Sequence, residues 1–193
     1  MRTCRRVACS ATLMLLVALA AASASDASRG IQLSQSRITA SGRLTMAGNS
    51  VCDVSITATT NSVTLLKQTG VTQFTLTAGS GTCTGPIGSA TLTLLTPWNG
   101  RYVSFRGTLP NITGINVMYT NAGWRGTYAL IGSCLWGGAL TGVTWNVSGG
   151  RWVSVTYNSS PVPLVSGTAF CPSTDIRSGT LTVVSPIPTV TLV

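Results

Sequence analysis

Side chains able to perform acid–base or nucleophilic chemistry are scarce in this chain of 193 residues. It contains no histidine and no glutamate, so Ser–His and Cys–His catalytic sites and histidine-ligated metal sites are excluded. A hydrolase with paired carboxylates would require Asp53 and Asp175 to converge. Each follows a cysteine closely, where an aspartate is expected to form a local Asx turn. The single lysine, Lys67, is expected at a solvated strand end, so we predict no catalytic residue, no enzyme activity and no cofactor.

The start of the chain has the pattern of a secretory signal peptide over 1–24. Three arginines (Arg2, Arg5 and Arg6) precede an apolar run at 13–21 that is too short to span a bilayer. Small residues that suit cleavage follow this run. We therefore predict a secreted or cell-envelope protein with no membrane span after the signal is removed.

Four cysteines remain once the signal, with Cys4 and Cys9, is removed. An even number in an exported chain without a Cys-x-x-Cys pair favours two disulfides over a metal site. Three pairings are open to four cysteines. We favour Cys52–Cys83 with Cys134–Cys171, because sequential pairing keeps each bridge within one half of the chain.

The chain is basic, with 12 Lys and Arg against three acidic residues and a formal net charge of +9. The basic residues that follow the signal are scattered singly along the sequence. They serve either to keep a weakly charged chain soluble or to bind an anionic polymer or glycan of the cell wall. We expect no nucleic-acid binding, because no basic cluster is present, and we expect a monomer.

Short runs of alternating apolar and polar residues fill the sequence from residue 31 onward, separated by turns rich in Gly, Asn and Ser. This period of two is typical of half-buried strands, and no amphipathic helix interrupts it. The pattern predicts an all-β protein, an antiparallel β-sandwich or β-barrel of about ten to twelve short strands with two disulfides. We expect one β-domain over 31–193, preceded by a disordered tail at 25–30.

A weak internal similarity leaves a second organisation open. Residues 89–97 resemble residues 178–186, and each segment follows a cysteine by a few positions. The domain could therefore consist of two similar halves, 31–97 and 98–193, or the likeness could be the chance similarity of two Thr- and Leu-rich strands. In either case residues 97–112 are expected to connect the halves, with a turn at Asn99-Gly100.

Tryptophans are the second kind of side chain that could form a site, because exposed aromatic rings stack on sugars. The alternation of the predicted strands places Trp124 and Trp145 inward, and Trp136 is expected to pack against the disulfide of Cys134. These three are therefore assigned to the core.

The remaining aromatic residues are expected at the surface. Trp152 is out of phase with the apolar residues that follow it, Tyr102 is out of phase with its neighbours, and Trp98 precedes the predicted turn. Together with Arg101, they form a predicted aromatic-basic binding patch of Trp98, Arg101, Tyr102 and Trp152.

The segment 97–112 also carries a resemblance. Its pattern is Pro-Trp, then Tyr-x-Ser-Phe-x-Gly-Thr-Leu-Pro-x-Ile, between two cysteine pairs. It resembles a group of small secreted β-rich proteins of actinobacterial type whose function is not established. The resemblance implies export, two disulfides and a β-fold, and it supplies no catalytic or binding residues. The Gly- and Asn-rich stretch 121–150 departs from the pattern.

These observations favour a non-enzymatic binding or structural component at or outside the cell envelope. One alternative is a carbohydrate-binding module for a cell-wall or environmental polysaccharide, which would need exposed aromatic residues. A membrane-inserting β-barrel is the other alternative, but the predicted strands are shorter than the roughly nine to eleven residues that a membrane strand requires.

Overall fold

The computed structural model describes residues 30–46, 49–108, 110–175 and 177–193. The predicted signal peptide (1–24) and nearly all of the predicted tail (25–30) lie outside the described residues, and Gly30 begins the first strand. No α-helix occurs among the described residues, so none of the kind that crosses a membrane is present in them.

The described residues form fourteen strands, and the all-β prediction is confirmed. In chain order they are β1 (Gly30–Leu33), β2 (Arg37–Met46), β3 (Ser50–Thr60), β4 (Thr64–Leu66), β5 (Thr72–Gly85), β6 (Gly88–Leu94), β7 (Trp98–Thr108), β8 (Asn111–Tyr128), β9 (Gly132–Ser148), β10 (Arg151–Asn158), β11 (Val162–Ser166), β12 (Thr174–Asp175), β13 (Ser178–Ser185) and β14 (Val190–Leu192).

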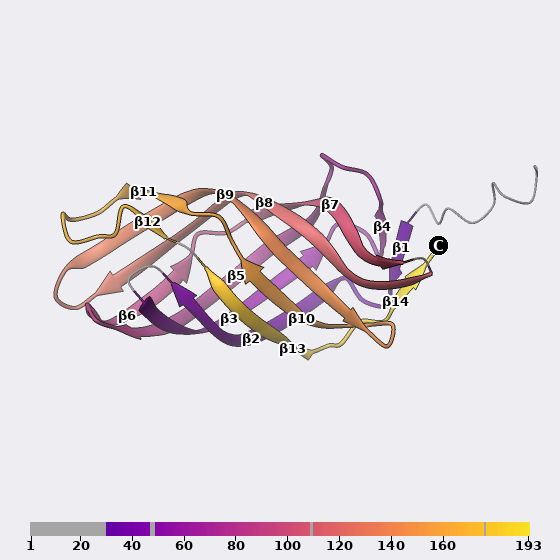
Figure 1. The fold of residues 1–193 in the computed structure, drawn as a ribbon, viewed down its shortest axis with the longest axis horizontal. Coiled ribbons are helices and arrows are strands. Elements are labelled where there is room, and N and C mark those ends of the chain that lie inside the picture. Colours follow the sequence, from indigo (N-terminus) through magenta and orange to yellow (C-terminus); the bar gives the residue numbers. More distant parts are fainter. Residues whose placement is uncertain (1–29, 47–48, 109, 176) are drawn as a thin grey trace, which may run out of the picture.

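The main sheet closes on itself as an antiparallel barrel (Figure 1). Its pairs run from β9 through β10, β13, β2 and β3 to β5. β6 and β7 then share the next position, because each pairs with a different part of β5 and of β8. β8 pairs with β9 and completes the ring. Strands of the first half of the sequence (β2, β3, β5 and β6) form one block of the ring, and strands of the second half form the rest. The two blocks pair without a break at β13–β2 and at β6–β8.

Two additions extend the barrel at its ends (Figure 1). A small sheet in the order β14-β1-β4 lies at one end, and its buried Ile31, Leu33 and Leu65 join the core. We call this sheet, with the loops beside it, the cap. Toward the opposite end, β11 pairs with β9, and β12 pairs with β11.

Both predicted disulfides are confirmed. Cys52–Cys83 joins residues that lie directly opposite each other on β3 and β5. Cys134–Cys171 ties β9 to the loop between β11 and β12. Structural disulfides of this kind indicate an oxidising environment, such as the outside of a cell.

Several predicted turns are strand interiors. β8 has 18 residues and β9 has 17, because the stretches around Asn121 and Gly137-Gly138 continue their pairing through irregular register. Asn121 has φ of 57°, a conformation that asparagine tolerates better than most residues. Asn99-Gly100 likewise lies within β7 and pairs with β8. The described strands of the predicted connector, β7 and the start of β8, therefore form part of the barrel wall.

Gly100 is required by packing. A Cβ atom at this position would lie 2.8 Å from the ring of Tyr119 and 2.8 Å from the Cβ of Phe74. The glycine therefore allows two aromatic side chains to approach the backbone of β7, which a turn signal in the sequence does not reveal.

Aromatic side chains fill the barrel in a continuous column. Trp152, Trp145 and Phe74 pack with ring centroids 5.2–6.5 Å apart. Trp145 Nε1 donates a hydrogen bond to Tyr119 Oη at 3.2 Å, and Trp98 packs on Tyr119. Trp124 lies 5.8 Å beyond Trp98. An eight-position barrel is just wide enough for such side chains, so the interior is a packed core.

The buried tyrosines predict alkaline unfolding. Burial raises the pKa of Tyr119 strongly and that of Tyr157 to about 12, and it also raises the pKa values of Tyr102 and Tyr128. The unfolded chain ionises its tyrosines near pH 10. Above that pH the unfolded chain therefore binds fewer protons than the folded protein does, so the free energy of unfolding falls as pH rises. Burial lowers the pKa of Arg177 to about 10. The effect of this shift on stability has the opposite sign, but it comes from one group against four tyrosines.

We therefore expect tyrosinate absorbance to appear together with loss of the near-ultraviolet circular dichroism signal, above about pH 10. Ionisation of all four tyrosines near pH 10 with the circular dichroism signal intact would contradict their burial.

Candidate functional site

The predicted aromatic-basic patch does not exist at the surface. Trp98 and Trp152 are 0% exposed and Tyr102 is 8% exposed, so the expectation that they face outward is wrong. Arg101 lies on the outer side of β7 and is half-buried. None of the three aromatic residues predicted to form a surface patch with Arg101 is therefore exposed beside it.

A register irregularity explains the error on two strands. The pairing shifts between Trp152 and Ser154 on β10, and between Tyr102 and Ser104 on β7. A bulge inserts one extra residue into a strand. The inward or outward alternation of the residues after the bulge therefore assigns the residues before it to the wrong face. Trp124, Trp136 and Trp145, which were assigned inward, are buried.

One polar cluster is buried at the end of the aromatic column. The Arg177 guanidinium carbon lies 3.8 Å from the ring centroid of Trp124 and 5.5 Å from that of Trp98. Trp124 Nε1 donates a 2.6 Å hydrogen bond to Asp175 Oδ2. Ser159 holds the backbone of Arg177 through two hydrogen bonds. The Arg177 N–H donates to Ser159 Oγ at 2.8 Å, and the Ser159 N–H donates to the Arg177 carbonyl oxygen at 2.9 Å.

This cluster is suited to holding the barrel end together. Desolvation lowers the pKa of Arg177 to about 10, while the charge of Asp175 acts in the opposite direction. The guanidinium therefore stays charged at neutral pH, and the aromatic faces and Asp175 compensate the charge. Arg177 Nε and Nη2 have no hydrogen-bond partner.

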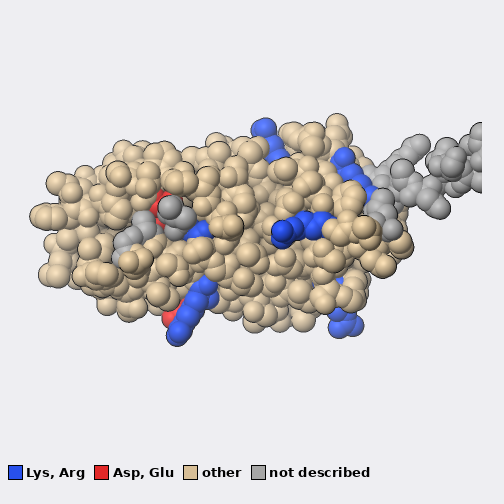
Figure 2. Space-filling model, viewed as in Figure 1, with Lys and Arg blue, Asp and Glu red and all other residues tan. Residues whose placement is uncertain are grey.

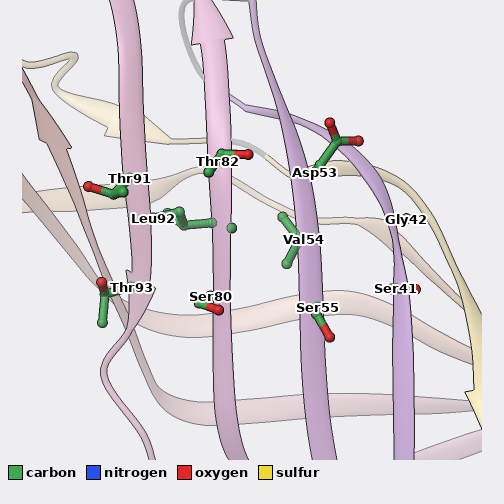
Figure 3. A pocket seen from close by; sticks show the side chains of 11 residues that line it. Ser41, Gly42, Asp53, Val54, Ser55, Ser80, Thr82, Thr91, Leu92 and Thr93 are labelled. Atoms are coloured by element: carbon green, nitrogen blue, oxygen red, sulfur yellow. The ribbon is translucent and has the colours of Figure 1, made fainter.

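The outer wall carries a hydroxyl-lined groove across β2, β3, β5 and β6 (Figure 3). Its volume is about 740 Å³. Hydroxyl groups and one carboxylate supply its polar side chains, and it has no aromatic lining residue. The polar lining residues are Ser41, Asp53, Ser55, Ser80, Thr82, Thr91 and Thr93.

Strand register arranges these side chains in two rows. Ser41, Ser55, Ser80 and Thr93 are successive partners across the four strands. Asp53, Thr82 and Thr91 form the neighbouring row on β3, β5 and β6. Neighbours within a row are about 4.8 Å apart and the rows are about 6.7 Å apart, as the spacing of antiparallel strands requires.

Gly81 lies in the floor of the groove, between the two rows. Gly81 shares the inward phase of its partners Val54 and Leu92, both of which are buried. A Cβ atom at Gly81 would lie 2.5 Å from the backbone oxygen of Asp53 and 3.1 Å from Val54 Cγ2. The absence of a side chain at Gly81 therefore allows β5 to pack closely on β3 beneath the two rows.

The groove has the chemistry of a binding surface. Asp53 forms an exposed 2.9 Å ion pair with Arg43 Nε. The other described carboxylate, Asp175, is buried inside the barrel, so the two aspartates lie on opposite faces of the wall. Within the described ranges, no three His, Cys, Asp or Glu side chains gather to hold a metal ion. Hydroxyls can both donate and accept hydrogen bonds.

Sequence reasoning missed this groove although part of its signal was visible. Thr91-Leu-Thr93 and Ser80-Gly-Thr82 place hydroxyls at alternate positions, which predicts one hydroxyl-bearing face on each strand. Which strands lie side by side, and in which register, is required to join these faces into a surface.

No protein-family model, curated protein or solved structure matches the chain. The geometry of the chain itself is therefore the basis for assigning a function.

The Arg177 cluster gives a stability prediction. Arg177→Met leaves the Asp175 carboxylate buried without its cation, and Asp175→Asn leaves the guanidinium without its counter-charge. Each should lower the free energy of unfolding by about 3–5 kcal/mol. The double variant should be less destabilised than the sum by about 1–3 kcal/mol. Denaturant unfolding of all four proteins measures this coupling, and additive effects would show that the two charges do not interact.

Proposed function

We propose that the protein is a non-enzymatic, exported binding component that acts at or outside the cell envelope and holds a hydroxyl-rich glycan in the groove of β2, β3, β5 and β6. The observation that carries this proposal is the double row of hydroxyls in an open groove. The predicted signal peptide and the two disulfides agree with a place outside the cytoplasm.

A glycan suits the chemistry of the groove. Sugar hydroxyls both donate and accept hydrogen bonds, and serine and threonine hydroxyls can rotate to match either role. The Asp53 carboxylate adds a strong acceptor at one side. The groove volume of about 740 Å³ lies within the usual range for small-ligand sites, which is enough for a few sugar units of a longer chain.

The mode of binding differs from stacking on aromatic side chains. All five tryptophans are buried, so a glycan would contact hydroxyls and backbone at the surface of the wall. We therefore expect little change in tryptophan fluorescence on binding, and contacts that depend mainly on hydrogen bonds should give modest affinity.

Valine substitution in the groove tests the proposal. The triple variant Thr82→Val, Thr91→Val and Thr93→Val keeps the shape of each side chain and removes its hydroxyl. Loss of hydrogen bonds worth about 1 kcal/mol each should weaken glycan binding at least tenfold. Sedimentation with insoluble peptidoglycan, chitin, cellulose and xylan, followed by calorimetry with soluble fragments, measures the affinity.

A matched control uses three threonines outside the groove, Thr108→Val, Thr141→Val and Thr174→Val, all at exposed positions. This variant should bind as the parent protein does, and both variants should unfold at nearly the parent's temperature. Failure of the parent to bind any glycan, or equal binding by the groove variant, would refute the proposed function.

A further inference from the structure

The net charge of the described residues is distributed unevenly along the barrel, although three of the eight described cations (Arg43, Arg125 and Arg177) lie away from the cap. The other five lie toward the cap: Arg37, Lys67, Arg101, Arg106 and Arg151. The described aspartates, Asp53 and Asp175, both lie in the other half. In Figure 2 the red atoms lie only in the half away from the cap, with blue side chains beside them, whereas the half that carries the cap shows blue side chains without red ones.

Strand register places these cations near the cap. Arg37 begins β2, directly after the segment in which Ser34 hydrogen-bonds to Thr189 of the cap loop. Lys67 follows β4, and its Nζ lies 5.3 Å from the ring centroid of Phe105 on β7. Arg151 begins β10, directly after the β9–β10 turn, and forms a β-bridge with Thr189.

The other two cations lie on β7. Arg101 is opposite Thr72, at the cap end of β5, and Arg106 is opposite Gly114, near the start of β8. Arg106 is exposed, as are Arg37 and Arg151. The positive charge therefore surrounds the cap on several strands and does not converge on a single point.

Exposed apolar side chains occur at the same end. Five large apolar residues of the cap and its loops are between 41% and 49% exposed: Val63, Leu66, Val71, Ile187 and Val193. Cations alone would suit any polyanion, whereas cations combined with exposed apolar residues are typical of proteins that lie on anionic bilayers. Apolar side chains gain by entering the boundary between headgroups and acyl chains, and the cations are attracted to the headgroup phosphates.

We propose that the cap end docks peripherally on an anionic lipid surface. Leu66 and Ile187 enter the headgroup boundary, and Arg37, Arg106 and Arg151 contact phosphates around them. This site is separate from the hydroxyl-lined groove, which lies on the outer wall of β2, β3, β5 and β6. A protein docked in this way could hold a glycan on its wall while its cap rests on the membrane.

Vesicle sedimentation of the exported protein tests this inference. It should bind vesicles of mixed phosphatidylglycerol and phosphatidylcholine but not phosphatidylcholine alone, and added salt should weaken the binding. Each cation near the surface contributes about fivefold in affinity, so Arg37→Gln, Arg106→Gln and Arg151→Gln together should weaken binding about a hundredfold. Leu66→Ser with Ile187→Ser should weaken it as well.

Matched controls exist at the opposite end. Arg43→Gln with Arg125→Gln removes two cations, and Leu130→Ser with Phe170→Ser removes apolar residues that are 87% and 74% exposed. Neither should change vesicle binding. The groove variant should also bind vesicles normally, so failure of the glycan proposal and failure of this one are distinguishable.

Two results would overturn the inference. The first is absence of binding to anionic vesicles. The second is a cap that binds soluble polyphosphate as tightly as vesicles and shows no loss with Leu66→Ser and Ile187→Ser, which would identify a site for soluble polyanions in place of a lipid surface.

Discussion

The aromatic column inside the closed barrel is the packing on which the structure depends. Trp152, Phe74, Trp145, Trp98 and Trp124 lie along the interior and contact one another or Tyr119. Large aromatic side chains bury more apolar surface than any others, which suits a chain with few charged residues and many threonines. Because the column fills the interior, any ligand site in the described barrel has to be sought on its outer wall or at its ends.

Closure explains why that outer wall is polar but weakly charged. Every strand of the ring has both neighbours paired, so the wall has no need of charged side chains to block edge-to-edge association. Serine and threonine suit strands and hydrate well, and they occupy outward positions on β3, β5 and β6. The same choice of residues produces the rows of hydroxyls, while the net positive charge is greater near the cap.

Buried charge marks the place where the column ends. Arg177 lies on the face of Trp124 and keeps its charge through that contact and through Asp175. Such pairs contribute little net stability compared with apolar residues, but removing one partner is costly. The cluster therefore fixes how the backbone at Arg177 enters the barrel before β13. The side chains of Asp175 and Arg177 are both buried, so neither is available for chemistry at the surface.

The sequence alone determined the all-β class, the supply of four cysteines for two disulfides and the lack of residues for histidine-based catalysis, because these depend on residue types and on local period. It favoured the observed disulfide pairing among three open ones, and the structure decided it. The sequence did not determine which face each aromatic residue takes, since one extra residue in a strand reverses the phase between the positions before it, such as Trp152 and Tyr102, and those after it. The sequence also predicted a turn at Asn99-Gly100, but Gly100 lies within β7 and allows the ring of Tyr119 to approach the backbone closely. The groove and the basic, apolar cap were decided by tertiary structure, because both join residues from strands far apart in the chain whose register only the closed barrel sets.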